Sequence, residues 1–164
     1  MRILLSGLIA LSVLAGPVRA AECIRPGDHS ALDVTALKTK LMVTALTCGA
    51  DEKYNAFVMK YRPELNNQDK ALGGYFSRSG GRRARQQQDD YVTQLANSQS
   101  QTGLRQGSLF CAQNLGTFDE VMALRSGQEL PDYAAGKSVL QPIALTECGT
   151  AAPASTQKQT RKRS

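Results

Sequence analysis

Along most of the chain, apolar residues recur at the three- and four-residue spacing of an α-helix. The strongest stripe runs from Val34 to Cys48, and Gly49 follows it in the position where helices commonly end. Ser30 is expected to cap the start of this helix, with Asp33 near its positive end. No stretch shows the sustained alternation of a half-buried strand. The pattern therefore predicts an all-α, single-domain bundle of five to six short helices.

A second helix is expected from Asp51, where aromatic and aliphatic residues again follow the helical period. Pro63 should break or restart this helix, because proline lacks a backbone donor and crowds the preceding turn. Similar stripes predict helices at 68–78 and 86–98. The next stretch, 99–107, is polar and contains two glycines, so we expect a loop there.

The C-terminal third of the body predicts two more short helices and a strap. The apolar stretch 108–115 predicts one helix. Thr117 and Glu120 match a capping box, which predicts that another helix begins there and ends before Gly127. Residues 129–145 include two prolines and a glycine, so we expect an extended strap over the bundle. Four apolar residues are expected to hold this strap: Val139, Leu140, Ile143 and Leu145.

The first twenty residues have the features of an export signal. Arg2 precedes a largely apolar stretch that is shorter than the roughly 20 residues of a membrane span. Small or apolar residues before Ala20 fit cleavage after that residue, with cleavage after Ala21 as the alternative. We therefore predict a signal peptide at 1–20, no transmembrane segment in the mature chain, and a periplasmic or secreted protein.

The net charge of +6 is concentrated at the ends of the chain. Of the 20 basic residues, two lie in the signal peptide and four in the last seven residues, so 14 remain to balance the 14 acidic residues. The domain at 21–150 is therefore neutral, which argues against a nucleic-acid partner. The segment 151–164 has no large apolar residue and is predicted to be a disordered basic tail.

The mature chain contains four cysteines, which in an exported protein predict two disulfides. A Cys23–Cys48 bridge is disfavoured, because about 18 helical residues would separate the two by about 27 Å. The preferred pairing is Cys48–Cys111 with Cys23–Cys148. Cys48–Cys148 with Cys23–Cys111 is the alternative. We interpret all four as structural, because no pair has the close spacing of a redox site.

The sequence lacks the patterns that carry most enzyme chemistry. His29 is the only histidine, and no histidines and cysteines are spaced as metal ligands, so no metal site or cofactor is predicted. His29 and the neighbouring Asp28 are interpreted as part of the turn that leads into the first long helix. No nucleophile motif or phosphate-binding loop is present, and no catalytic residue is assigned.

Arg82, Arg83 and Arg85 follow two glycines and form the candidate anion-binding residues. Arginines at a helix start oppose the helix dipole, and a bound anion such as a lipid phosphate or a peptidoglycan carboxylate would offset that cost. In the alternative interpretation the helix begins near Gln86, and the arginines are solvated or paired with acidic residues one turn further on.

These features favour an exported, non-catalytic envelope protein that acts by binding or structural interaction. Its partner would be an envelope protein or an anionic surface. The segment Leu37 to Tyr61 resembles exported helical proteins of Gram-negative bacteria, which implies an envelope location and no activity. The alternative is a small extracytoplasmic hydrolase that uses carboxylates from separate helices.

Overall fold

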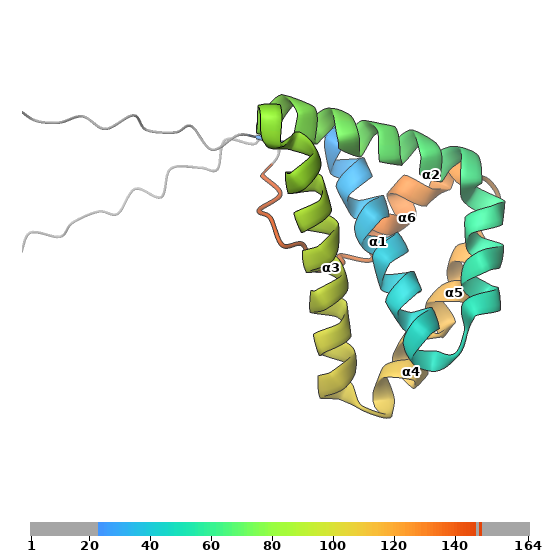
Figure 1. The fold of residues 1–164 in the computed structure, drawn as a ribbon. Coiled ribbons are helices and arrows are strands. Elements are labelled where there is room, and N and C mark those ends of the chain that lie inside the picture. The colour runs from blue at the N-terminus through green and yellow to red at the C-terminus, as the bar shows by residue number, and fades with distance from the viewer. Residues whose placement is uncertain (1–22, 147, 149–164) are drawn as a thin grey trace, which may run out of the picture.

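The computed structural model describes residues 23–146 and Cys148, which form an all-α bundle (Figure 1). The predicted signal peptide and basic tail lie outside these residues. The elements are α1 (Pro26–Cys48), α2 (Asp51–Gly80), the 3-10 helix η1 (Gly81–Arg83), α3 (Ala84–Gln106), α4 (Leu109–Asn114), α5 (Gly116–Met122), the 3-10 helix η2 (Gly127–Glu129) and α6 (Leu130–Gly136). Among these helices none is long and apolar enough to cross a membrane.

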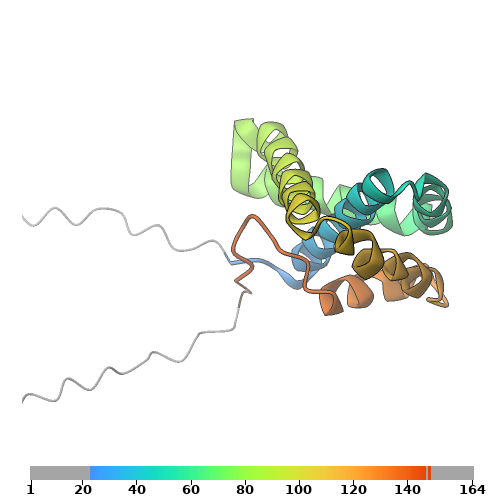
Figure 2. The same ribbon diagram turned by 90° about the horizontal axis from the view of Figure 1, so that it is seen from below.

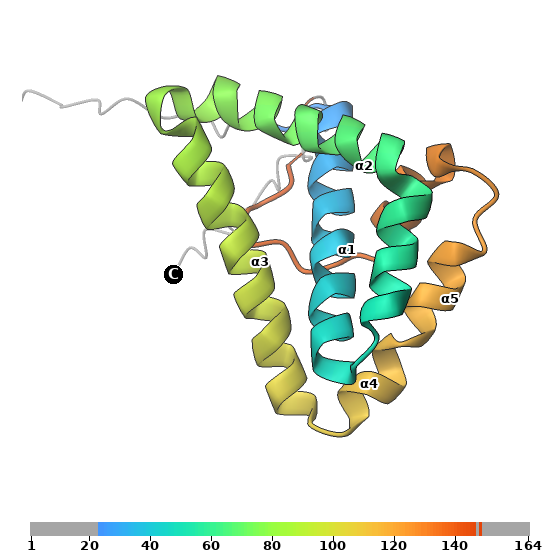
Figure 3. The same ribbon diagram turned by 45° about the vertical axis from the view of Figure 1, so that its right-hand side comes forward.

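Helix α1 lies at the centre of the bundle, between α3 and the first half of α2 (Figure 3). Its apolar residues are buried on several faces, and three of its threonines are buried with them. Two of these threonines satisfy their hydroxyls locally: Thr35 donates to the Ala31 carbonyl at 2.7 Å, and Thr39 donates to that of Thr35 at 2.8 Å. A helix with this composition can be enclosed by neighbours on all sides.

Helix α2 continues through Pro63 as a single element and does not break there. Figure 1 shows that it changes direction along its length, which is the usual effect of an internal proline. Its first half runs beside α1, and its second half crosses the end of the bundle to reach α3. One bent helix therefore contributes to two separate hydrophobic cores.

The first core, which we call the helix-bound core, is enclosed by α1, α2, α5 and α6. It contains Val34, Leu37, Leu41, Ala45, Phe57, Tyr61, Leu65, Phe118, Val121, Leu130 and Ala134. The second, the strap-covered core, contains Ile24, Ala31, Leu32, Ala36, Leu72, Phe76, Tyr91 and Leu95. Val139, Ile143 and Leu145 cover it from the irregular segment 137–146, which we call the strap.

Both predicted disulfides are present. Cys48–Cys111 joins the end of α1 to α4, with the two Cα atoms 5.6 Å apart. Cys23–Cys148 joins the two ends of the described chain, with Cα atoms 4.7 Å apart. Ile24 N donates to the Thr146 carbonyl at 2.8 Å, and Cys148 N donates to the Ile24 carbonyl at 3.0 Å. The covalent clasp is thus reinforced by backbone pairing, and Figure 2 shows the strap approaching the start of α1.

The predicted cap at Ser30 is wrong, because α1 begins four residues earlier at Pro26. Proline suits the first helical position, since its fixed φ is helical and its missing donor would have no partner there. Ser30 lies inside the first turns, and its hydroxyl donates to the Pro26 carbonyl at 3.2 Å. The predicted end of the helix is confirmed by Gly49, which adopts a left-handed φ of 65°.

The predicted loop at 99–107 is also wrong, because α3 continues to Gln106. Gln99 and Gly103 are buried on this part of the helix, and the Phe110 ring lies next to Gly103. The short helix predicted at 108–115 is confirmed by α4. The last turns of α3 are therefore helical despite their polar composition, and they line a polar pocket.

Two predictions in the C-terminal third need correction. Thr117 does not cap α5, which begins at Gly116 without a side-chain cap, and Glu120 pairs with residues of the α6 region. The Lys60 side chain of α2 donates hydrogen bonds to a carbonyl at the end of α5 and to another just after it, so a residue of a different helix caps the C-terminal end of α5.

The strap prediction at 129–145 holds only for its second half, because η2 and α6 are helical. Leu140 in the strap is 69% exposed and does not hold it down.

Candidate functional site

The predicted arginines lie in a sharp turn between α2 and α3. Gly81 has a φ of 54°, a value that suits glycine because it has no Cβ, and it reverses the chain at the end of α2. Arg82 and Arg83 belong to η1, and Arg85 lies in the first turn of α3. We refer to these three arginines as the arginine turn, which occupies one corner of the molecule in Figure 1.

All three side chains of the arginine turn are exposed. Within residues 23–146, none of them forms an ion pair, a hydrogen bond or a ring contact, so the pairing considered with acidic residues one turn further on is not formed. Arg78, the basic residue just before the turn, behaves differently and pairs with the buried carboxylate of Asp28. The arginine turn is therefore a group of free cations beside a helix start.

The arginine turn is on the same end of the bundle as the chain ends. The Arg78–Asp28 ion pair ties the end of α2 to the start of α1, and α1 begins three residues after Cys23. Cys23 is in turn bonded to Cys148, after which the basic tail follows in the sequence. The basic side chains of the turn and the attachment point of the tail are thus brought towards one end of the molecule.

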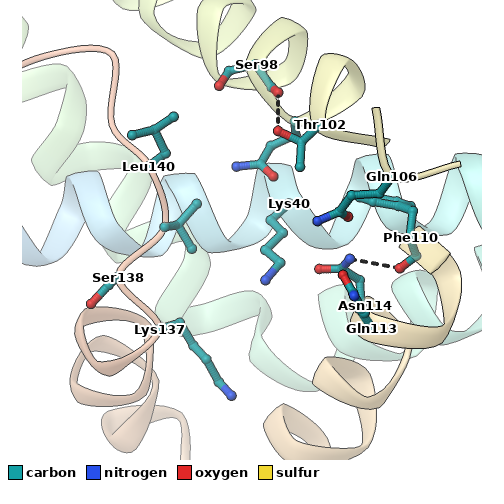
Figure 4. A pocket seen from close by; sticks show the side chains of 12 residues that line it. Lys40, Ser98, Thr102, Gln106, Phe110, Gln113, Asn114, Lys137, Ser138 and Leu140 are labelled. Carbon is teal, nitrogen blue, oxygen red and sulfur yellow. Dashed lines mark hydrogen bonds between the residues drawn. The ribbon is translucent and has the colours of Figure 1, made fainter. Parts of the chain in front are cut away.

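A polar pocket lies at the other end of α3 (Figure 4). It has a volume of about 240 Å³ and is formed by α1, the last turns of α3, α4 and the start of the strap. Its polar lining residues are Lys40, Ser98, Gln99, Thr102, Gln106, Gln113, Asn114, Lys137 and Ser138. The stretch that the sequence predicted as a loop supplies much of this wall.

Two lysines line the pocket, and only one of them is paired with a carboxylate. Lys137 pairs with Glu120 and lies over the Tyr133 ring at 5.0 Å from its centroid. Lys40 is half-buried and, within the described residues, has neither a hydrogen bond nor an ion pair. Burial lowers the pKa of Lys40, and the charge of Lys137 lowers it further, while Glu120 partly offsets both effects. Figure 4 shows the Lys40 side chain extending from α1 into the space between Asn114 and Lys137.

The carboxamides in the wall also have free hydrogen-bonding capacity. Gln99 is only 8% exposed and forms no hydrogen bond with another described residue. The Oε1 atom of Gln106 is buried without a partner. Asn114 donates its amide to the Phe110 carbonyl at 2.8 Å, which fixes its orientation in the pocket wall. Buried polar groups without partners are costly, so the pocket is suited to a polar occupant.

The histidine belongs to a structural network under the strap. Nδ1 of His29 lies 2.8 Å from a carboxylate oxygen of Asp33, and not beside its neighbour Asp28. Gln141 donates to Asp33 at 3.2 Å and accepts from the Tyr91 hydroxyl at 2.6 Å. Burial, followed by the nearby charge of Asp33, raises the pKa of Tyr91. This network joins α1, α3 and the strap. The predicted turn at Asp28 and His29 is wrong, because both residues lie inside α1, which begins at Pro26.

The hydrolase alternative requires carboxylates from separate helices. In four pockets lined by described residues, the carboxylates of each wall come from at most one helix. Several carboxylates pair with cations, as in Lys38–Asp69 at 3.2 Å and Lys53–Asp119 at 2.7 Å. In the part of the chain that the structure describes, no three potential metal-binding side chains are grouped together.

No known protein family matches this chain, and comparisons with curated proteins and with solved structures also find no match. The arginine turn and the polar pocket are therefore the two candidate sites. The sequence predicts the first as a candidate, whereas the second was not predicted. A signal for the pocket was present, because Gln99, Thr102 and Gln106 follow the helical period as a polar stripe.

Proposed function

We propose that the protein is exported and acts without catalysis, by attaching to an anionic surface of the cell envelope. One observation carries the proposal: Arg82, Arg83 and Arg85 are exposed within one turn of the chain and are unpaired with other described residues. Guanidinium groups bind phosphate and carboxylate oxygens through two parallel hydrogen bonds, so such a turn is well suited to an anionic surface.

The basic tail supports this proposal through its position in the sequence. It carries Lys158, Arg161, Lys162 and Arg163 and follows the cysteine that is clasped to Cys23. A basic residue close to an anionic membrane contributes about 1 kcal/mol. Two cationic elements at one end of a neutral body would act together, since binding of one raises the effective concentration of the other.

The proposed location rests on the same cysteines. Two disulfides in a small domain are typical of proteins in oxidising compartments such as the periplasm or the extracellular space. The export signal predicted at 1–20 agrees with this location. We infer that the mature protein works in the envelope or is secreted, and that it meets lipid phosphate groups at a membrane surface.

The test is co-sedimentation of the oxidised mature protein with phosphatidylcholine vesicles, with and without phosphatidylglycerol. We expect binding only to the anionic vesicles, and loss of binding at high salt because the attraction is screened. The triple variant R82Q/R83Q/R85Q should bind about tenfold or more weakly. Isolated peptidoglycan, used in place of vesicles, distinguishes a carboxylate surface from a phosphate surface.

The control is R62Q/K70Q/R105Q, which removes the same formal charge from exposed positions distributed over α2 and α3. This variant should bind nearly as well as the unmodified protein. If both triple variants lose affinity equally, net charge and not the arginine turn governs attachment. Unchanged binding by the first variant would contradict the proposal.

A further inference from the structure

We infer that the polar pocket around Lys40 is a binding site for a small monocarboxylate that carries several hydroxyl groups, as a sugar acid does. This site is distinct from the arginine turn, because the two lie at opposite ends of α3 (Figures 1 and 4). The inference does not depend on attachment to a surface.

The charge of the pocket indicates a single negative charge on the ligand. Lys137 is already paired with Glu120, so this pair adds little net charge. Lys40 is the unpaired cation, and no carboxylate is among the residues of the pocket wall. Lys38, two residues earlier on α1, forms an ion pair with Asp69. A half-buried lysine of this helix therefore pairs with a carboxylate where one is within reach. A ligand carboxylate would supply the partner that Lys40 lacks.

The rest of the wall indicates hydroxyl groups on the ligand. Carboxamides of Gln99, Gln106 and Gln113 and the hydroxyls of Ser98 and Thr102 surround the cation. Carboxamide groups donate and accept hydrogen bonds, and so do the hydroxyl groups of a ligand. The Gln106 carboxamide lines the pocket, and its buried Oε1 atom has no hydrogen-bond partner among the described residues. The Thr102 hydroxyl already donates to the Ser98 carbonyl, but a purely apolar acid would leave the Gln99 carboxamide unpaired, which costs affinity.

Size and shape limit the ligand further. The volume of about 240 Å³ lies below the roughly 300–1,000 Å³ of sites for drug-sized molecules, so the ligand is small. Phe110, Val139 and Leu140 supply an apolar part of the wall, against which the carbon skeleton of a sugar acid can pack. Ser138, one of the lining residues, has a φ of 46°, an uncommon value for a residue other than glycine. The strap therefore has an uncommon backbone conformation where it borders the pocket.

The test is isothermal titration with four probes that share one ring: glucuronate, glucose, glucosamine and glucose 6-phosphate. We expect glucuronate to bind most tightly. Glucose lacks the charge, glucosamine has the opposite charge, and the phosphate monoester carries about two negative charges at neutral pH. In K40M the affinity for glucuronate should fall about tenfold to a hundredfold, the usual effect of losing a charge-assisted hydrogen bond.

Two controls keep the test decisive. K70M removes an exposed lysine of α2 that has no hydrogen bond or ion pair with described residues, and should bind like the unmodified protein. K40M should keep its thermal midpoint or raise it, because a half-buried cation without a partner is removed. The inference is overturned if none of the probes binds, if glucose, glucosamine or glucose 6-phosphate binds as tightly as glucuronate, or if folded K40M binds glucuronate unchanged.

Discussion

The helix-bound core and the strap-covered core share α1 and α2 but are closed in different ways. The first is closed by α5 and α6, whose apolar residues such as Phe118 and Leu130 are almost fully buried. The second is closed partly by the strap, whose Ile143 and Leu145 are only partly buried. The strap is held by a disulfide, by backbone pairing to Ile24 and by the Gln141 network. Apolar burial stabilises the first closure, whereas specific polar and covalent links are essential for the second.

This difference determines which part of the molecule should open first. A segment with few buried apolar contacts has a low local free energy of opening, even in a stable domain. We therefore expect the strap to open before α5 and α6 separate from α1. Substitutions in the two closures test this order.

Truncation of Phe118 to alanine should have the largest effect. Phe118 is 1% exposed in the helix-bound core, and truncation of a buried phenylalanine costs about 3–5 kcal/mol. Leu145→Ala in the strap should cost only about 1 kcal/mol, because this side chain is partly buried. Urea unfolding at constant pH measures both. Equal losses in the free energy of unfolding would show that the strap stabilises its core as strongly as α5 and α6 stabilise theirs.

Replacement of one cysteine pair by serine should cost about 2–4 kcal/mol in the free energy of unfolding. C23S/C148S should also accelerate amide hydrogen exchange in the strap and at Ile24, where the covalent clasp adjoins the backbone pairing. C48S/C111S serves as the matched variant and should leave strap exchange nearly unchanged in native conditions. If strap exchange responds equally to both variants, the strap does not open independently.

Tyr91→Phe should have the smallest effect at neutral pH, about 0.5–1.5 kcal/mol, because one hydroxyl to Gln141 and Leu32 is lost. Its pH dependence is more informative. The pKa of Tyr91 is raised in the folded protein, so the unfolded chain loses this proton first, at about pH 10. Stability therefore falls as pH rises above about 10, by up to about 1.4 kcal/mol per pH unit for one group.

Denaturant unfolding between neutral pH and pH about 11 measures this slope. Tyr91→Phe should reduce it. Tyr133→Phe is the matched change beside the helix-bound core, where burial and then the hydrogen bond to Glu120 raise the pKa of Tyr133. Tyr133→Phe should also reduce the slope of stability against pH, but it should not accelerate amide hydrogen exchange in the strap. An alkaline slope that Tyr91→Phe leaves intact would contradict the burial of this hydroxyl under the strap.

The helical period predicted the fold class well, because α1 and the first half of α2 each carry a clear apolar stripe. The length of α1 argued against a bridge between Cys23 and Cys48 and left two pairings open, of which the preferred one is present. Local signals failed where a partner from elsewhere in the chain decides the structure. Glu120 matches a capping box, but Lys137 and Tyr133 bind it instead.

The last turns of α3 show why the pocket could not be predicted as a site. Gln99, Thr102 and Gln106 lie in a stretch with a single large apolar residue, Leu104, and were interpreted as a loop, because the usual helix signal assumes an apolar core on one face. Their helix faces a polar cavity. The opposite wall comes from Lys40 and Lys137, which are far away in sequence, so their convergence depends on the tertiary structure.

The clasp between Cys23 and Cys148 also has a mechanical consequence. These residues are 125 positions apart in sequence, yet their Cα atoms are 4.7 Å apart and covalently linked. Tension applied between the N-terminal and C-terminal segments would pass directly through the sulfur–sulfur bond. The helices between them lie outside this path, so pulling on the two ends would not stretch the bundle while the bond is intact. A force applied between the two terminal segments would thus leave the helical bundle folded.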